Sequence, residues 1–241
     1  AGPALARMGW GPADGEDERG ARLRATLIVA LGVLGADPEV RARAAEVLQA
    51  AEADPGAVDA DVAGAALTVV ATTGGTEEYD RFLARHREAT TPQEEVRYLY
   101  ALARFDDEAL LRRTLDLSLT EARTQNTPFV VTLLLGDRAV GATAWRLLTE
   151  RWDEFTGRLP ESLQERALGG ITSLSTPELA AEVRAFLEAH RIASRERTVS
   201  QLLERLDVLV SLRQREAAGL GALLGSRSPH YAGRANPGPT G

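Results

Sequence analysis

The sequence predicts an all-α fold in which HEAT-like antiparallel helix pairs stack into a curved α-solenoid. Apolar residues recur at the helical period along almost the whole chain. Several of these stretches are preceded by a capping residue and a proline, the order that opens helices. No convincing strand pattern interrupts them, so we expect about eleven helices and no sheet.

The elements follow a loop at residues 9–20, which is rich in Gly, Pro and acidic residues and has no period. The first long helix is expected from about residue 20, where the apolar period begins with Leu23. Three later helix starts have a capping residue followed by proline, namely Asp37-Pro38, Thr91-Pro92 and Thr176-Pro177. The remaining starts are expected near positions 59, 76, 107, 127, 138, 160 and 196.

In pairs, these helices recur at about thirty to forty residues, the length of HEAT-like units that bury their apolar stripes by stacking. Because stacking forms one continuous core, residues 1–225 are predicted to be a single domain with a concave face. Residues 226–241 contain several Pro and Gly residues without an apolar period. They cannot offset the entropy cost of ordering, so we expect a disordered tail.

The composition excludes several kinds of partner. The formal charge is -7, and the 35 acidic residues are interspersed with 28 basic residues, all of them Arg. Nucleic-acid binding driven by counterion release is therefore not expected. No run approaches the roughly 18 apolar residues of a membrane helix, so no membrane partner is expected. Cysteine is absent, which excludes disulfides and thiolate metal ligands and favours a cytoplasmic protein.

Few residues could carry chemistry. His86, His190 and His230 are the only histidines, and no two have the spacing of about three or four residues that a zinc site on a helix needs. Without Lys, a phosphate-binding Gly-x-x-x-x-Gly-Lys loop is impossible. We therefore assign no catalytic residue, no metal ligand and no cofactor to this chain itself.

Three further patterns have a structural interpretation. The acidic pairs Asp106-Asp107 and Glu94-Glu95 lie at predicted helix starts, where carboxylates interact favourably with the helix dipole. The glycines from Gly219 to Gly225 end a helix, whereas a dinucleotide fingerprint follows a strand. Trp145 and Trp152 are interpreted as core residues, with a peptide-binding aromatic patch as the alternative.

The candidate site is the segment at residues 123–128. Asn126 or Thr127 can cap the helix that Pro128 starts, which leaves Arg123 and Gln125 without a local structural task. A guanidinium at the rim of a concave solenoid can bind the carboxylate of a peptide or of a neighbouring domain. Arg123, Gln125 and Asn126 are therefore predicted to contact a substrate or a domain interface, with capping and domain packing as the alternative.

A succession of landmarks along the chain resembles one known family. They are Leu23 to Gly35 followed by Asp37-Pro38, then Tyr79-Asp80-Arg81-Phe82, Arg123-Thr124-Gln125, Trp145 and Arg197-Thr198. Their order is similar to that of the C-terminal helical domain of the aminopeptidase N family of zinc metallo-aminopeptidases. The family's domain starts earlier than Pro3, so the resemblance implies an N-terminally truncated domain. The family's His-Glu-x-x-His zinc motif and Gly-Ala-Met-Glu-Asn-like segment do not occur in this sequence.

The resemblance implies a non-catalytic accessory domain that closes the cavity of a zinc-dependent aminopeptidase, a hydrolase that removes N-terminal residues from peptides. Zinc would then be bound by a catalytic domain of the same polypeptide, and that domain and the peptide would be the partners. A free-standing helical-repeat adaptor that binds a partner protein or peptide on its concave face is the alternative. A gene that continues upstream through a His-Glu-x-x-His motif would favour the aminopeptidase domain over the adaptor.

Overall fold

The computed structural model describes residues 1–13, 15–192 and 196–226. These residues form thirteen α-helices and no strand, against the roughly eleven helices that the periodicity predicts. The helices are α1 (Gly2–Met8), α2 (Glu18–Val29), α3 (Pro38–Ala53), α4 (Ala60–Thr73), α5 (Thr76–Glu88), α6 (Pro92–Leu102), α7 (Glu108–Thr120), α8 (Thr127–Gly136), α9 (Gly141–Glu150), α10 (Trp152–Arg158), α11 (Glu161–Ala167), α12 (Pro177–Ala189) and α13 (Glu196–Ser226). A π-helical segment η1 (Ala30–Leu34) extends α2, and a 3-10 segment η2 (Leu168–Ser173) extends α11. The all-α prediction is confirmed.

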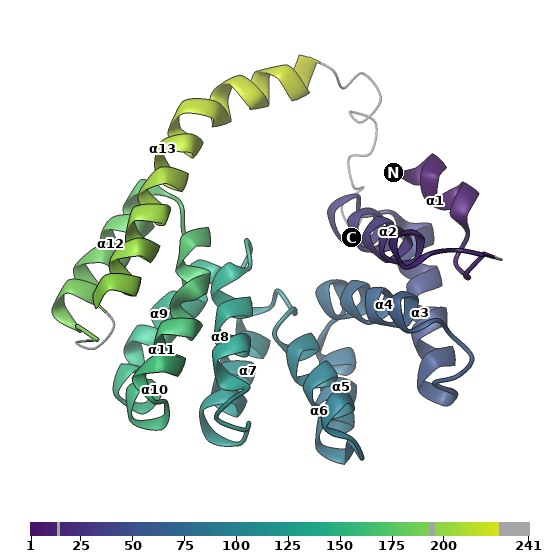
Figure 1. The fold of residues 1–241 in the computed structure, drawn as a ribbon, viewed down its shortest axis with the longest axis horizontal. Helices are drawn as coiled ribbons and strands as arrows, with labels where there is room; N and C mark the ends of the chain where they lie inside the picture. The colour runs from purple at the N-terminus through teal and green to yellow at the C-terminus, as the bar shows by residue number, and fades with distance from the viewer. Residues whose placement is uncertain (14, 193–195, 227–241) are drawn as a thin grey trace, which may run out of the picture.

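The helices succeed one another along an arc, with α1 and α2 at one end and α12 and α13 at the other (Figure 1). Neighbouring elements pack in turn, with α2 and α3 against α4, α5 against α6, α7 and η2 against α8, and α12 against α13. Each helix thereby buries an apolar stripe that it cannot bury alone, and one core runs along the arc. That these pairs repeat as HEAT-like units of a solenoid stays a prediction.

The helix starts that have a capping residue are where the sequence predicts them. Asp37 accepts hydrogen bonds from the backbone N–H of Glu39 at 3.0 Å and of Val40 at 3.2 Å. Thr91 and Thr176 cap α6 and α12 with their side chains. Such a cap contributes about 1 kcal/mol, and the proline that follows is already in the helical range of φ.

The paired acidic residues also lie at helix starts, as predicted. Asp107 caps α7 by accepting from the N–H groups of Ala109 at 2.8 Å and Leu110 at 3.0 Å. Glu94 and Glu95 lie in the first turn of α6. Their carboxylates stabilise the positive ends of these helices.

The periodicity does not predict α1 and α10. Each has seven residues, which is about two helical turns and too short to show a period. Because α9 ends before Arg151 and α10 begins after it, Trp145 and Trp152 lie on different helices and not on one face. The N-terminal loop also ends earlier than expected, since Asp17 caps α2 by accepting from Gly20 N–H at 2.9 Å.

Two aromatic clusters fill the core. In the middle of the arc, Tyr79 packs on Phe105 and Phe82 on Tyr98 in edge-to-face geometry, with ring centroids 5.3 Å and 5.5 Å apart. Towards the C-terminus, the two tryptophans of α9 and α10 both pack T-shaped against Phe186. These tryptophans are 0% and 7% exposed, so their interpretation as core residues is confirmed and the aromatic-patch alternative is wrong.

The C-terminal helix α13 continues to Ser226, so the predicted domain end at residue 225 falls at the end of a helix. The glycines from Gly219 to Gly225 lie in its last turns, as predicted for a helix terminus. The tail predicted to be disordered at residues 226–241 lies outside the described residues apart from Ser226. None of the described helices is long and apolar enough to cross a membrane.

The fold should lose stability at alkaline pH through Tyr98. Burial raises the pKa of Tyr98 to about 12 from 10.0, and Glu52, which accepts its hydroxyl hydrogen bond, raises it as well. Because the folded-state pKa lies above the unfolded one, the stabilisation is complete below about pH 10 and is lost as the pH rises through about 12. The loss amounts to about 3 kcal/mol at most.

We expect Tyr98→Phe to show a smaller loss of unfolding free energy than the parent between about pH 9 and about pH 12. Burial also raises the pKa of Tyr79, so part of the alkaline loss should persist in the variant. Urea unfolding at several pH values measures, for parent and variant, the slope of the unfolding free energy against pH. Equal slopes in parent and variant would contradict the role of Tyr98.

Candidate functional site

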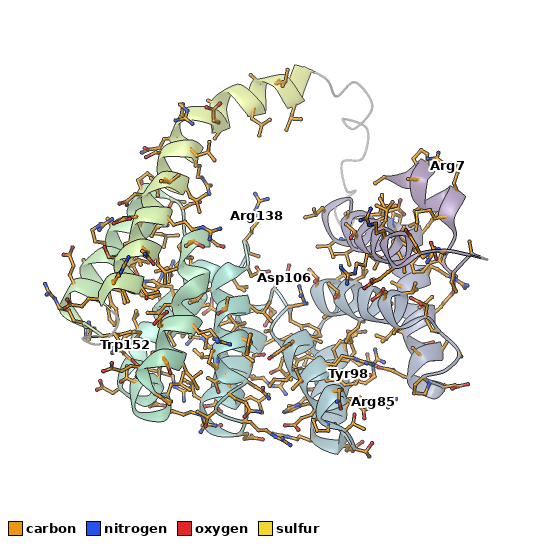
Figure 2. All side chains as sticks on the ribbon, in the orientation of Figure 1. Arg7, Arg85, Tyr98, Asp106, Arg138 and Trp152 are labelled. Carbon is orange, nitrogen blue, oxygen red and sulfur yellow. The ribbon has the colours of Figure 1, made fainter. Side chains whose placement is uncertain are left out.

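The connections between the central helices fall at two edges of the arc. Figure 2 shows Asp106 and Arg138 on the inner side of the arc, in the turns from α6 to α7 and from α8 to α9. Since successive helices run in opposite directions, the turn from α7 to α8 lies at the other end of these helices. We call residues 103–107 and 137–140 the inner edge and residues 121–126 the outer edge.

The predicted site residues lie at the outer edge. Arg123 forms an ion pair with Glu95 of α6 at 2.8 Å, and the two side chains are 57% and 21% exposed. Gln125 is exposed, whereas Asn126 is buried. The expectation that Arg123 has no local task is therefore wrong, because the turn after α7 lies against the first turn of α6. The segment is also not at the inner rim of the arc.

Within the described structure, neither Asn126 nor Thr127 caps α8 with its side chain. Asn126 holds the N-cap position, but its backbone is helical, with φ -92° and ψ -26°, whereas a capping residue is typically extended. A backbone hydrogen bond from Asn126 N–H to Arg123 O at 2.8 Å forms a turn directly before the helix. The Thr127 hydroxyl donates instead to Ser118 O at 2.8 Å, which ties α8 to α7. The capping prediction is wrong for this reason.

At the inner edge, a half-buried cation lies near one carboxylate. Arg104 and Asp137 line a small pocket of about 190 Å³ together with residues of α8. Asp137 Oδ1 accepts from the N–H groups of Ala139 at 2.8 Å and Val140 at 3.1 Å. Burial lowers the pKa of the Arg104 guanidinium, and the charge of Asp137 raises it in part. Arg104 forms no ion pair with the described residues, so its charge is incompletely compensated.

Arg104 and Arg138 were not predicted from the sequence. They follow α6 and α8 in two turns at the same edge, and at least one aspartate is present in each turn. Their spacing could have indicated that they share an edge, because turns separated by one repeat of about thirty to forty residues lie at the same edge of an antiparallel helix array. The unusual motif at residues 123–128 lies instead in the turn between them.

A larger groove adjoins the inner edge. It has a volume of about 1020 Å³ and lies between residues 136–138, residues 172–176 and the inner face of α13. The wall that α13 supplies contains Arg205, Leu209, Arg213 and Leu220. The groove therefore combines guanidinium groups with an apolar wall.

His86 and His190 have structural environments. His86 is buried, and its Nδ1 lies 2.9 Å from the backbone oxygen of Glu95. His190 follows the last turn of α12 and stacks on Phe186, with ring centroids 4.0 Å apart. His230 lies outside the described residues. Across the described part of the chain, no group of three His, Cys, Asp or Glu side chains is placed to hold a metal ion.

An arc of packed helices with charged residues along its inner edge is typical of helical domains that bind other polypeptide segments. Comparison with known families identifies the family to which this helical domain belongs. The chain belongs to the family of the ERAP1-like C-terminal domain, whose family model matches residues 1–208. The resemblance to the C-terminal domain of aminopeptidases is thereby confirmed.

Similar proteins include plant and yeast aminopeptidases. The chain is 30% identical over 213 residues to Aminopeptidase M1-A of Oryza sativa subsp. japonica, a match that covers 86% of this chain and 24% of the relative. It is 29% identical over 214 residues to Aminopeptidase M1 of Arabidopsis thaliana, covering 85% and 24%. It is 26% identical over 212 residues to the alanine/arginine aminopeptidase of Saccharomyces cerevisiae, covering 84% and 24%. The chain thus spans 24% of the length of these relatives.

Proposed function

We propose that this chain is the C-terminal accessory domain of a zinc-dependent aminopeptidase and closes the cavity in which N-terminal residues are removed from peptides. The match of residues 1–208 to a family of C-terminal domains carries the proposal. Because the chain spans 24% of relatives named as aminopeptidases, most of such a protein lies outside it. The names of these relatives favour an aminopeptidase domain over a free-standing adaptor.

In this proposal the zinc is bound outside this chain. The described residues bring no three ligating side chains together, and the sequence has no His-Glu-x-x-His motif. The chain itself is then non-catalytic. Its residues would close the cavity and contact the part of a peptide that lies far from the metal. The catalytic domain of the same polypeptide and the peptide substrate are the proposed partners.

The inner edge is the proposed peptide-facing surface, and Arg104 is its main contact residue. Burial removes part of the Arg104 side chain from water, while Asp137 compensates its charge only in part and no ion pair forms with the described residues. A carboxylate that enters the adjoining pocket would therefore form a strong charge-assisted hydrogen bond. Arg138, which is exposed on the same edge (Figure 2), would attract such a group at longer range.

Arg123, Gln125 and Asn126 are proposed to belong to a domain interface and not to the peptide contact. They lie at the outer edge, at the opposite end of α7 from the inner edge. Arg123 is 57% exposed, so a carboxylate of a neighbouring domain can reach guanidinium N–H groups that Glu95 does not use.

Arg104→Ala in the full-length protein is expected to raise the KM for long peptides about tenfold, because a hydrogen bond to a charged group contributes about 1.5–3 kcal/mol. The kcat/KM for an aminoacyl anilide should not change, since so short a substrate does not reach the inner edge. Steady-state kinetics with both substrates measures the difference.

Arg123→Ala is the matched control, because it removes an exposed arginine at the opposite edge. A role at the domain interface should lower the activity on both substrates alike, by disturbing the closed state. An Arg104→Ala protein that processes both substrates like the parent, or that loses activity on both equally, would contradict the peptide contact.

A further inference from the structure

The C-terminal helix α13 consists of a packed half and an exposed half. In the packed half, Leu203 and Leu206 are buried, and Asp207 pairs with Arg184 of α12 at 2.6 Å. All residues from 211 to 225 are exposed. Figure 1 shows the exposed half extending past α12 and bending over the inner side of the arc. We call residues 209–226 the overhang.

The overhang continues a spacing that is typical of coiled coils, with leucines at its two ends and two charged residues at its centre. Spacings of three and four residues alternate along the positions Leu206, Leu209, Arg213, Glu216, Leu220 and Leu223. Leu212 and Leu220 are 44% and 54% exposed. Because an isolated helix of this length is marginal in water, such leucines favour a second helix packed against them.

The apolar face of the overhang opens onto the groove of about 1020 Å³. Leu209, Leu212 and Leu220 all line it, together with Arg205 and Arg213. The space beside these leucines is therefore accessible from solvent and has the length of several helical turns. A helix that packs on the overhang would enter this space.

The overhang lies outside the residues that the family model matches. The family match ends at residue 208, directly before the overhang begins. A contact with the parts common to aminopeptidases would be expected within the matched residues. The occupant of this face should therefore be specific to chains that carry the overhang, and a second copy of this chain fulfils that condition.

We propose that the overhangs of two copies of this chain pair antiparallel around a two-fold axis. In the register centred between Arg213 and Glu216, Leu209 packs on the partner's Leu220, and Arg213 pairs with the partner's Glu216. The two-fold axis repeats each contact, so the pair contains two leucine contacts and two opposite-charge contacts. Parallel pairing would place equal charges opposite each other at both central positions and is disfavoured.

The charges of the overhang and its neighbours support this register. Glu216 contacts Arg215 of its own helix at 2.6 Å, a pair that is 57% and 68% exposed and therefore weak. Arg213 forms no ion pair with the described residues and lines the groove. Arg205 would lie beside the C-terminal turn of the partner's overhang, where a cation interacts favourably with the helix dipole. The inference goes beyond the proposed function and does not depend on it.

Charge reversal within the overhang tests the pairing. The 241-residue chain should show a mass that rises with concentration from 25.9 kDa towards about twice that value in sedimentation equilibrium. Arg213→Glu and Glu216→Arg are each expected to weaken the association at least about tenfold, because each replaces two opposite-charge contacts by like-charge contacts. An equimolar mixture of the two variants should regain the parent's association, since each variant then meets the opposite charge in the other.

Arg215→Glu is the control, because it reverses the charge of a neighbouring exposed arginine that does not line the groove; it should associate like the parent. Unchanged thermal melting by circular dichroism checks that each variant is folded. A parent that is monomeric at every concentration, or a mixture that associates as weakly as the single variants, overturns the proposal. Association that arises only after removal of residues 227–241 would assign the apolar face to that segment and would also overturn it.

Discussion

Glu16→Ala is expected to lower the free energy of unfolding by about 3–5 kcal/mol, because it leaves a buried guanidinium without its carboxylate. Arg24 of α2 is 0% exposed, and its Nη2 lies 2.7 Å from Glu16 Oε1. Its Nε donates to the backbone oxygen of Gly9 at 3.1 Å. These contacts fasten Gly9 and Glu16 to α2, so the variant should also loosen the N-terminal end of the arc.

The matched control is Arg22→Ala, which removes an arginine two residues before Arg24 on the same helix. Arg22 pairs with Glu18 at 2.5 Å, but the two side chains are 72% and 77% exposed, so the loss should be below about 1 kcal/mol. Glu16→Gln keeps an acceptor oxygen, so its loss of unfolding free energy should lie between the losses of the two alanine variants. Urea unfolding followed by circular dichroism and by tryptophan fluorescence measures all three variants. Equal losses for Glu16→Ala and Arg22→Ala would show that burial does not strengthen the first pair.

Gly170→Ala is expected to destabilise the fold by about 1–3 kcal/mol, because no room for a methyl group exists where η2 crosses α8. A Cβ at Gly170 would lie 2.6 Å from Thr132 O, 2.7 Å from Leu135 Cβ and 3.2 Å from Gly136 N. Two of these atoms belong to the backbone of α8, which can move only by opening the contact with η2. Residues 136–138 also line the groove, so the variant should disturb the inner edge.

Gly169→Ala is the control, and the expected sign is opposite. A Cβ at Gly169 meets no atom of the described structure within 4 Å. The added methyl group then mainly restricts the unfolded chain, which should stabilise the protein by about 0.4–1 kcal/mol. Urea unfolding of both variants gives the two free energies. Two changes of the same sign would contradict the close approach of η2 to α8.

Local sequence signals predicted the helix starts where a side chain completes the local structure. Asp37, Thr91, Asp107 and Thr176 cap helices where the sequence places them, because a cap involves only residues two or three positions apart. At the start of α8 the same reasoning failed. Ser118, a residue from the preceding helix, takes the hydroxyl of Thr127, and that competition is not visible in a local pattern.

The candidate site could be predicted only in part. Sequence reasoning selected Arg123 as a guanidinium without a partner, but Glu95, which lies on another helix, pairs with it. It missed Arg104, whose importance comes from burial next to Asp137 and not from an unusual motif. Both errors have one origin, since a single sequence shows which residues are charged but not which of them are brought together or removed from water.

The sequence by itself determined that this protein is all-α, where most of its helices begin, and to which family it is similar. Periodicity and capping decide the fold class and the helix starts because they act between residues within one or two helical turns. The order of landmarks along the chain carries the family similarity. Only the tertiary structure decided which turns share the inner edge, that Arg24 and Glu16 meet, and that residues 211–225 of α13 are exposed. These properties depend on contacts between distant segments, whose energies arise from burial and charge proximity after the helices have packed.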